Sequence, residues 1–307
     1  MSIVDVTKPI TSQSCEETIL ALVEKYPFCR TELLTTTAFG RPVRTLVIGT
    51  GPRKVIYTAA HHANEWITAL LLLQFAQDLA QSIADGTEIF GVPGNQIARE
   101  ATIYMVPLVD PDGVDLVVGA ISDDPGYRQA QRIAAQFPQI PFPNGWKANL
   151  NGVDLNLQYP AGWLQAREIK FMQGFDRPAP RDYVGRAPLD QKESRALAGY
   201  TEYIDPALIL AFHSQGQQIY WKYQDIQIPG AKELGEVFAK VSGYTLEDTP
   251  YASGFAGYKD WFILRFGKPG YTVEVGQGEN PLPLEQFPQI YRDNLGILVT
   301  AALGRGV

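Results

Sequence analysis

The chain has 307 residues, of which 45% are hydrophobic and 19% are charged. This length and composition are typical of a soluble globular protein, and we expect one domain over residues 1–307, with residues 1–40 as a helical N-terminal extension packed on it. The formal net charge of -7 and the pI near 5.1 show that the chain lacks the basic excess of nucleic-acid-binding proteins. Nucleic acid is therefore not expected as a partner.

Hydrophobic periodicity and turn signals divide the chain into alternating strands and helices. Helices are expected at residues 12–26, 66–83, 127–136, 191–203, 231–241, 258–266 and 284–303. Strands are expected at residues 43–48, 54–60, 101–109, 207–213 and 271–275. A loop is expected at residues 84–100, a tight turn at 110–113, a long surface excursion beside a cleft at 120–151 and a second irregular stretch at 160–189. The alternation predicts an α/β fold with a mixed central sheet flanked by helices.

The first residues and the cysteines indicate where the protein works. The N-terminus lacks the basic and apolar regions of a secretory signal, and the longest apolar run, residues 67–73, is too short to span a bilayer. We therefore expect a cytoplasmic protein with no membrane partner. Cys15 and Cys29 are too few for a disulfide scaffold and are expected to be free thiols. The sequence does not predict an oligomeric state.

Polar residues follow several of the expected strands, where the site of an open α/β sheet lies. His62 and Glu65 follow the strand expected at residues 54–60, and His213 ends the strand expected at 207–213. Two histidines and one glutamate form a ligand set of catalytic zinc, with a fourth position left open. The alternative is that each histidine is a hydrogen-bonded structural residue. His61 is expected to be structural, because its side chain should point to the face opposite that of His62.

Glu274 stands between Val273 and Val275 in the strand expected at residues 271–275. A carboxylate is costly to bury in such a run unless a charge or a function holds it there. Near a metal it would be a suitable general base, because the metal lowers the pKa of water to about 7. The alternative is an ordinary buried ion pair.

Five segments, in this order, resemble the zinc metallocarboxypeptidases typified by carboxypeptidase A, over roughly residues 40–305. These segments are His62-Ala63-Asn64-Glu65-Trp66, Pro111-Asp112-Gly113, Gly152-Val153-Asp154-Leu155-Asn156, His213-Ser214 and Glu274. The resemblance implies a carboxypeptidase A-like fold and a zinc ion held by His62, Glu65 and His213. It also implies that Glu274 activates a water and passes its proton to the leaving amine.

The residue after Asn156 bears on the substrate. In the carboxypeptidases this asparagine is followed by an arginine that binds the terminal carboxylate, whereas here Leu157 follows it. Loss of a bidentate guanidinium removes the main reason to require a free C-terminal carboxylate. Residues 146–163, 273–276 and 280–283 most resemble the bacterial γ-D-glutamyl-L-diamino acid endopeptidases, which cut the bond between γ-D-glutamate and meso-diaminopimelate in cell-wall peptides. The resemblance therefore implies a peptidoglycan-derived peptide as the substrate.

The same resemblance implies roles for three further residues, and the carboxylates of diaminopimelate call for cations as well. Asp154 matches an aspartate that orients a zinc-bound histidine. Tyr251 matches a tyrosine that caps the substrate, and Lys147 aligns with an arginine that polarises the scissile carbonyl, where a lysine charge could stabilise the oxyanion. Arg181 and Arg186 are candidates for binding the carboxylates of the substrate. The alternative for these three cations is a solvated surface charge.

Three other functions remain open from the sequence. An ordinary zinc carboxypeptidase would trim C-terminal residues, although Leu157 disfavours it. A non-catalytic module would bind the metal or a peptide without hydrolysis. A serine hydrolase is suggested by Ser214 and Ser253, but neither lies in the Gly-x-Ser-x-Gly pattern of the α/β hydrolases.

Overall fold

An eight-stranded mixed β-sheet forms the centre of the computed structural model, which describes residues 2–306. Across the sheet the strands follow the order β1-β2-β6-β3-β7-β10-β8-β9. Their bounds are β1 Arg30–Thr36, β2 Pro42–Ile48, β3 Arg53–Ala59, β6 Ala101–Val106, β7 Leu208–His213, β8 Gln218–Tyr220, β9 Thr245–Glu247 and β10 Gly270–Glu274. The expected α/β fold with a mixed sheet is confirmed.

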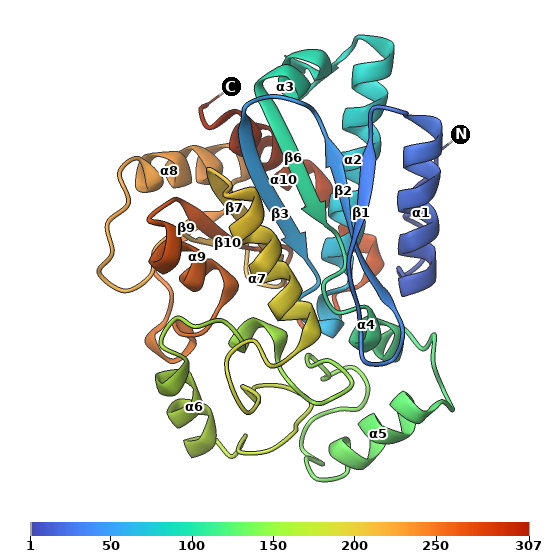
Figure 1. Cartoon of the computed structure of the whole chain (residues 1–307), viewed down its shortest axis with the longest axis vertical. Helices are drawn as coiled ribbons and strands as arrows, with labels where there is room; N and C mark the ends of the chain where they lie inside the picture. Colours follow the sequence, from blue (N-terminus) through green and yellow to red (C-terminus); the bar gives the residue numbers. More distant parts are fainter. Residues whose placement is uncertain (1, 307) are drawn as a thin grey trace.

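The four central strands β6, β3, β7 and β10 are parallel to one another. The outer strands β1, β2 and β8 pair antiparallel with their inner neighbours. In Figure 1 the arrows of β3 and β6 point to the same end of the molecule, where α5, α6 and the long loops drawn in green lie. The carboxyl ends of the parallel strands therefore share one edge of the sheet, beneath this loop region.

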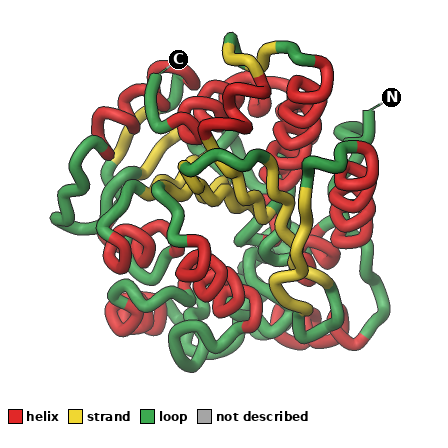
Figure 2. Tube along the Cα trace, turned by 45° about the horizontal axis from the view of Figure 1, so that its top comes forward, coloured by secondary structure: helices red, strands yellow, loops and turns green. Residues whose placement is uncertain are grey.

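Helices cover both faces of the sheet, which Figure 2 shows as a central layer of strands between helices. One core cluster includes side chains from α1 Ser12–Lys25, α2 Ile67–Asp85, α3 Gly94–Glu100, α4 Pro111–Val117, α5 Pro125–Ala134, α8 Ala231–Ser242 and α10 Phe287–Leu303. A second cluster includes side chains from α6 Trp163–Met172, α7 Lys192–Ile204 and α9 Tyr258–Phe266. Short 3-10 helices lie at Ala63–Glu65, Leu155–Leu157, Tyr251–Ser253 and Leu284–Gln286, and a small hairpin joins β4 Glu88–Ile89 to β5 Val92–Pro93.

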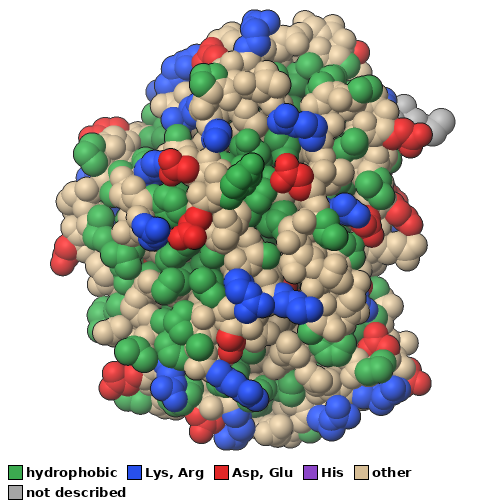
Figure 3. All heavy atoms as spheres, in the orientation of Figure 1, with side chains coloured by type: hydrophobic (Ala, Val, Ile, Leu, Met, Phe, Trp, Pro, Cys, Tyr) green, Lys and Arg blue, Asp and Glu red, His purple; other side chains and the backbone are tan. Residues whose placement is uncertain are grey.

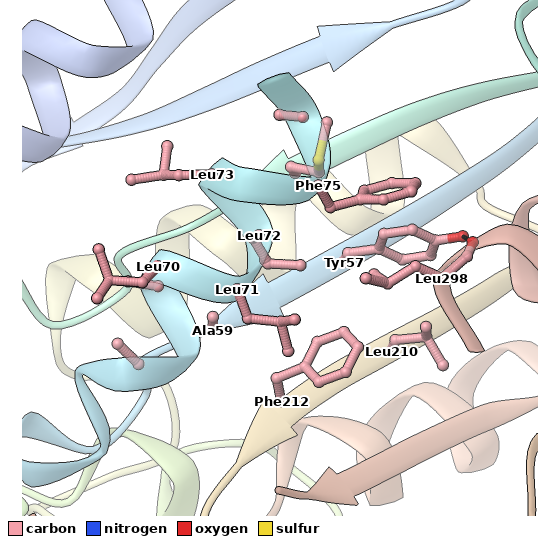
Figure 4. Packing of buried hydrophobic residues seen from close by; sticks show 14 of the residues in the cluster. Tyr57, Ala59, Leu70, Leu71, Leu72, Leu73, Phe75, Leu210, Phe212 and Leu298 are labelled. Atoms are coloured by element: carbon pink, nitrogen blue, oxygen red, sulfur yellow. Dashed lines mark hydrogen bonds between the residues drawn. The ribbon is translucent and has the colours of Figure 1, made fainter. Parts of the chain in front are cut away.

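The central strands alternate between the two clusters, as the pleat of a strand requires. Tyr57 packs in the first cluster and Ile56 in the second. Figure 4 shows Tyr57 beside Phe75 of α2, with Phe212 of β7 close by, and the Tyr57 hydroxyl donates a hydrogen bond of 2.8 Å to the carbonyl of Leu298. Burying each side chain of this size contributes about 1.5–3 kcal/mol, which holds β3 and β7 firmly in register where the histidines follow.

The structure corrects the expected loops. Residues 84–100 contain the β4–β5 hairpin and α3, which packs its single large apolar residue, Ile97, into the core. The turn expected at residues 110–113 begins α4, because the Asp110 side chain caps the amide of Gly113 and a proline occupies the first turn. The irregular stretch 160–189 contains α6, and the strand expected at 101–109 ends at Val106.

The N-terminal residues are part of the sheet layer as well as of the helical layer. Residues 12–25 form α1, as expected, but residues 30–36 form the edge strand β1, so the extension over residues 1–40 is not wholly helical. Helix α2 is long and apolar enough to cross a membrane by length and composition, contrary to the expectation from the short apolar run. Its most apolar window is 67% buried inside the protein, which is typical of the core helix of a globular fold.

Charged residues of both signs are interspersed on the face shown in Figure 3. No histidine is visible on this face. His61 and His213 are buried and His62 is nearly so. All three histidines therefore lie inside the protein or at the wall of a cavity.

Candidate active site

The three expected metal ligands meet at the carboxyl edge of the sheet. His62 follows β3, Glu65 ends the 3-10 helix Ala63–Glu65, and His213 is the last residue of β7. His62 Nδ1 lies 3.0 Å from Glu65 Oε1, and His213 Nδ1 lies 2.9 Å from Glu65 Oε2. The two Nδ1 atoms are 3.3 Å apart. The two histidine nitrogens and both carboxylate oxygens thus surround one point.

This spacing fits a tetrahedral zinc ion. Zinc–nitrogen bonds are about 2.0–2.1 Å long, so two nitrogens on one tetrahedral zinc lie roughly 3.3 Å apart. One ligand atom each from His62, Glu65 and His213 lies within 4.8 Å of the other two. Glu65 and His213 are only 1% and 2% exposed, so the protein covers most of the site and leaves access from the side of His62. The donors and their arrangement fit catalytic zinc.

Asp154 holds the ring of His62 in place. Its Oδ1 accepts a hydrogen bond of 3.0 Å from His62 Nε2, while backbone amides of Asn156 and Asp182 donate to its two oxygens. Burial alone would raise the pKa of Asp154, but His62 and Lys147 hold it below its usual value. The carboxylate therefore stays charged and holds the proton on Nε2, which leaves the Nδ1 lone pair free for a metal.

A proton competes with the metal for His62. Burial lowers the pKa of His62, but the nearby carboxylates of Glu65 and Asp154 outweigh burial and raise the pKa to about 9 in the absence of a metal. Burial lowers the pKa of His213, which is therefore neutral. A metal that binds near neutral pH must displace the proton of His62.

Glu274 lies beside the metal ligands without a partner of its own. It ends β10, where it is the register partner of His213. Among residues 2–306 its carboxylate has no ion pair or hydrogen bond, so the structure does not support the alternative of an ordinary buried ion pair. Burial and the charge of Glu65 raise the pKa of Glu274 to about 8 before a metal binds, and a bound dication would lower it.

The side chain of Lys147 extends from the loop region to the carboxylate of Glu65. Its Nζ lies 2.8 Å from Glu65 Oε1, and its carbonyl accepts a hydrogen bond from the amide of Ala63. Burial opposes the charge on Lys147, but Glu65 keeps its pKa above the usual value. An ammonium has three donors, and within the described chain only one of those of Lys147 is bonded. The other two are free to reach a substrate.

These groups line a cavity of about 230 Å³. Asn156, Leu157 and Arg181 also line it, as expected of substrate-binding residues. Leu157 is 9% exposed and packs in the second core cluster, so the part of the cavity wall that it forms is apolar. The side chain of Arg181 is 42% exposed, and its Nε lies 2.6 Å from Asp182 Oδ2. The cavity thus combines a metal centre, a free carboxylate and a cation that substrate can reach.

Comparison with known proteins identifies the family. A model of the zinc carboxypeptidase family matches residues 15–296. The chain belongs to this family. It is therefore a zinc metallopeptidase, a hydrolase whose zinc is expected to be held by His62, Glu65 and His213.

Individual relatives of this zinc metallopeptidase include enzymes of different specificity. Gamma-D-glutamyl-L-diamino acid endopeptidase 1 of Lysinibacillus sphaericus is 39% identical over 281 residues, which cover 92% of this chain and 69% of that protein. Carboxypeptidase B of Rattus norvegicus is 27% identical over 284 residues, which cover 84% and 62% of the two chains. The structure of carboxypeptidase A from Helicoverpa armigera has the same fold, with a TM-score of 0.72 and 17% identity over 98% of this chain and 75% of that chain.

Two of the residues proposed from the sequence lie away from the cavity of the zinc metallopeptidase. Tyr251 is 71% exposed, stacks edge-on against Phe255 and borders a neighbouring hollow. Arg186 is exposed and borders a separate hollow with Gln191. Arg186 lies on an irregular segment and Tyr251 begins a 3-10 helix of three residues, and residue types alone do not determine the path of either segment. The structure therefore does not bring Arg186 to the expected substrate site, and Tyr251 would have to move to reach it.

Four charged residues of the cavity were missed from the sequence. Lys170 and Asp182 form an ion pair of 2.5 Å, and Lys259 pairs with Asp260, and all four line the cavity. Lys170 lies in the stretch that was expected to be irregular, so the sequence did not indicate where its side chain points. Lys259 and Asp260 stand in an expected helix, where a lysine beside an aspartate is normally a solvated pair.

His61 and Ser214 have structural roles. His61 is fully buried, stacks on the ring of Tyr258 and has its Nε2 3.3 Å from the hydroxyl of Tyr159. Burial lowers the pKa of His61 well below the usual value, so the ring is neutral. The Ser214 hydroxyl donates to Asn280 Oδ1 at 2.8 Å rather than to a histidine. The structure therefore gives no support to a serine hydrolase built on Ser214.

Proposed function

We propose that this zinc metallopeptidase hydrolyses the γ-D-glutamyl bond to meso-diaminopimelate or a related diamino acid in peptidoglycan stem peptides. The observation that carries the proposal is Leu157, which forms an apolar wall where the carboxypeptidases place an arginine for the terminal carboxylate. The 39% identity to a gamma-D-glutamyl-L-diamino acid endopeptidase supports the same substrate class.

In the proposed mechanism Glu274 is the general base. Zinc, when bound, supplies Lewis acidity that polarises the scissile carbonyl and makes water acidic near neutral pH. Glu274 takes one proton from the attacking water, whose oxygen bonds to the γ-carbonyl carbon. When the carbon–nitrogen bond then breaks, Glu274 returns the proton to the leaving amine. Its lack of another partner leaves both carboxylate oxygens available for these transfers.

Lys147 and Arg181 would meet the negative charges of the substrate. Lys147 holds a charge beside Glu65, so its free donors can stabilise the oxyanion that develops on the scissile carbonyl. Arg181 and Lys170 both pair with Asp182. Two cations thus face one carboxylate, and the part of the cavity wall formed by these three residues carries a net positive charge. A γ-linked D-glutamate keeps its α-carboxylate free, and this wall is suited to receive it.

Paired synthetic peptides test the function. We expect the zinc-loaded protein to cleave a γ-D-glutamyl-diaminopimelate peptide and to act at least about a hundredfold more slowly on an α-linked L-peptide with a free C-terminus. Glu274→Gln should lower kcat on the first peptide by a factor on the order of 10² or more while zinc binding is retained. Glu279→Gln, a matched change at an exposed glutamate of the adjacent loop, should leave kcat unchanged.

Two results would overturn this proposal. Preferential release of C-terminal residues from the α-linked peptide would favour an ordinary carboxypeptidase. Activity that persists after complete removal of zinc would exclude the metal-dependent mechanism. The expected cytoplasmic location stays a prediction, which fractionation of producing cells would test.

A further inference from the structure

The carboxylate of Glu65 is buried, and four groups among residues 2–306 contact its two oxygens. His62 Nδ1 and Lys147 Nζ lie 3.0 and 2.8 Å from Oε1. His213 Nδ1 and the backbone amide of Ser214 lie 2.9 and 3.2 Å from Oε2. Both histidines are expected to turn these same nitrogens to zinc. The lysine and the backbone amide then remain as the donors that hold the carboxylate.

These two donors differ in rigidity. Lys147 donates from the end of a long side chain, and its other donors are expected to meet the substrate. The Ser214 amide belongs to the backbone, so its direction is set by the path of the chain directly after β7. A carboxylate that binds a metal is normally held by hydrogen bonds from outside the ligand set. The Ser214 amide is therefore the rigid support of Glu65, and a group that fixes Ser214 bears on the metal centre.

The side chain of Asn280 holds Ser214 by two hydrogen bonds. Its Nδ2 donates to the backbone carbonyl of Ser214 at 2.6 Å, and its Oδ1 accepts from the Ser214 hydroxyl at 2.8 Å. A side-chain amide can make both bonds because it carries a donor and an acceptor on one rigid plane. The paired bonds fix the backbone and the side chain of Ser214 together.

The segment that carries Asn280 continues β10 and runs beside the segment that continues β7. The amide of Val275 donates to the carbonyl of His213 at 2.8 Å, and the amide of Gly216 donates to the carbonyl of Gly276 at 2.9 Å. Asn280 is half-buried and lies outside the lining of the active-site cavity. Its hydrogen bonds therefore lead toward the metal centre and not toward a substrate.

We infer that Asn280 is a positioning residue for the metal centre. It holds Ser214 so that the Ser214 backbone amide donates to Oε2 of Glu65, and this bond keeps the carboxylate in the orientation that binds zinc. Within the described chain Asn280 makes no hydrogen bond to a metal ligand, so it acts through Ser214. The inference goes beyond the proposed function, because it concerns how the zinc site is built and not which peptide bond is cut.

Zinc affinity, measured by competition with a chromogenic chelator, tests the inference without a substrate. Asn280→Ala removes both bonds to Ser214. It should weaken zinc binding at least about threefold, since loss of a group that directly holds a ligand costs about 10- to 100-fold and Asn280 is one contact further away. Ser214→Ala loses only the hydroxyl bond, so its effect should be smaller. The double variant should bind zinc as Asn280→Ala does, because one chain of contacts carries both effects.

Cobalt in place of zinc reports on ligand geometry, which a purely structural role of Asn280 would leave unchanged. The visible absorption of cobalt(II)-loaded Asn280→Ala should differ from that of the wild-type protein in position or intensity. Asn95→Ala is the matched control. It removes a half-buried asparagine whose Nδ2 donates to the carbonyl of Ile83 at 3.2 Å, in α3 at the amino end of β6, the opposite edge of the sheet. It should change neither zinc affinity nor the cobalt spectrum.

Thermal melting of the metal-free proteins separates positioning from folding. If Asn280→Ala weakens zinc binding by less than about threefold, whatever its melting temperature, the inferred role is wrong. An unchanged cobalt spectrum would also overturn it. If Asn280→Ala does not fold, Ser214→Ala carries the test, and an unchanged cobalt spectrum of that variant would overturn the inference. No peptide is cleaved in these measurements, so their failure would leave the proposed substrate untouched.

Discussion

Replacing Asp154 by asparagine should weaken zinc binding while leaving the surrounding loop in place. Asparagine keeps an oxygen that can accept from the amide of Asn156, as Asp154 Oδ1 does at 3.1 Å. What it loses is the negative charge facing His62 Nε2 at 3.0 Å and the second oxygen, which accepts from the amide of Asp182 at 3.2 Å. Without this charge the imidazole is a poorer donor to the metal, and its ring is held less firmly in the tautomer that exposes Nδ1.

The expected magnitude follows from this single contact. Loss of such a carboxylate partner typically lowers metal affinity by about 10- to 100-fold. This corresponds to roughly 1.4–2.7 kcal/mol, which agrees with the value of about 1.5–3 kcal/mol for a hydrogen bond to a charged group. Because zinc stabilises the folded state by mass action, the variant should lose a similar part of the zinc-dependent stabilisation at a fixed zinc concentration.

Competition with a chromogenic zinc chelator would measure the affinity, and thermal melting with and without zinc would measure the stabilisation. Asp176→Asn is a suitable control, because it removes a half-exposed carboxylate that pairs only with Arg177 in the neighbouring loop. If Asp154→Asn folds normally and its zinc dissociation constant stays within about twofold of the wild-type value, the inferred role of Asp154 is wrong.

Two further predictions concern protons. Zinc affinity should rise at least about tenfold per pH unit up to pH 9, because the proton of His62, with its pKa of about 9, competes with the metal. Calorimetry at pH 7 in buffers of different ionisation enthalpy should show release of about one proton from His62 and up to one more from Glu274, whose pKa of about 8 a bound dication lowers, and release of none would contradict this. Burial raises the pKa of Glu193 from 4.5 to about 7, so stability present below pH 4.5 is lost as the pH rises through 7. In urea unfolding, Glu193→Gln should therefore be more stable than wild type by up to about 3 kcal/mol at pH 8 and equally stable at pH 4. Equal stability of the two proteins at both pH values would refute this prediction.

The sequence by itself determined the central strands of the sheet and the metal ligands. Apolar runs of strand length predicted β3, β7 and β10 close to their observed bounds, because buried parallel strands are apolar on both faces. The ligands could be found because His62 and His213 directly follow or end such runs. Parallel strands end at one edge of a sheet, so residues 151 positions apart were expected to meet.

Only the tertiary structure decided which other charges reach the substrate. Arg181 and Arg186 stand in the same irregular stretch, yet Arg181 lines the cavity and Arg186 borders another hollow. No periodicity relates such loop residues to a common face, so their sequence does not indicate which way they point. The exposure of Tyr251 was equally inaccessible, since it depends on how the loop before α9 packs.

The burial of the ion pair of Lys259 and Asp260 was likewise decided only by the tertiary structure. Its two residues are adjacent, and in a helix nothing in their sequence separates a solvated pair from a buried one. Burial follows from the packing of α9 beside β10, and Lys259 is held by its contacts with Lys222 and Thr249. The sequence thus determined the metal centre through strand ends, whereas the fold alone placed the other charges that line the cavity, because their burial depends on segments distant in the chain.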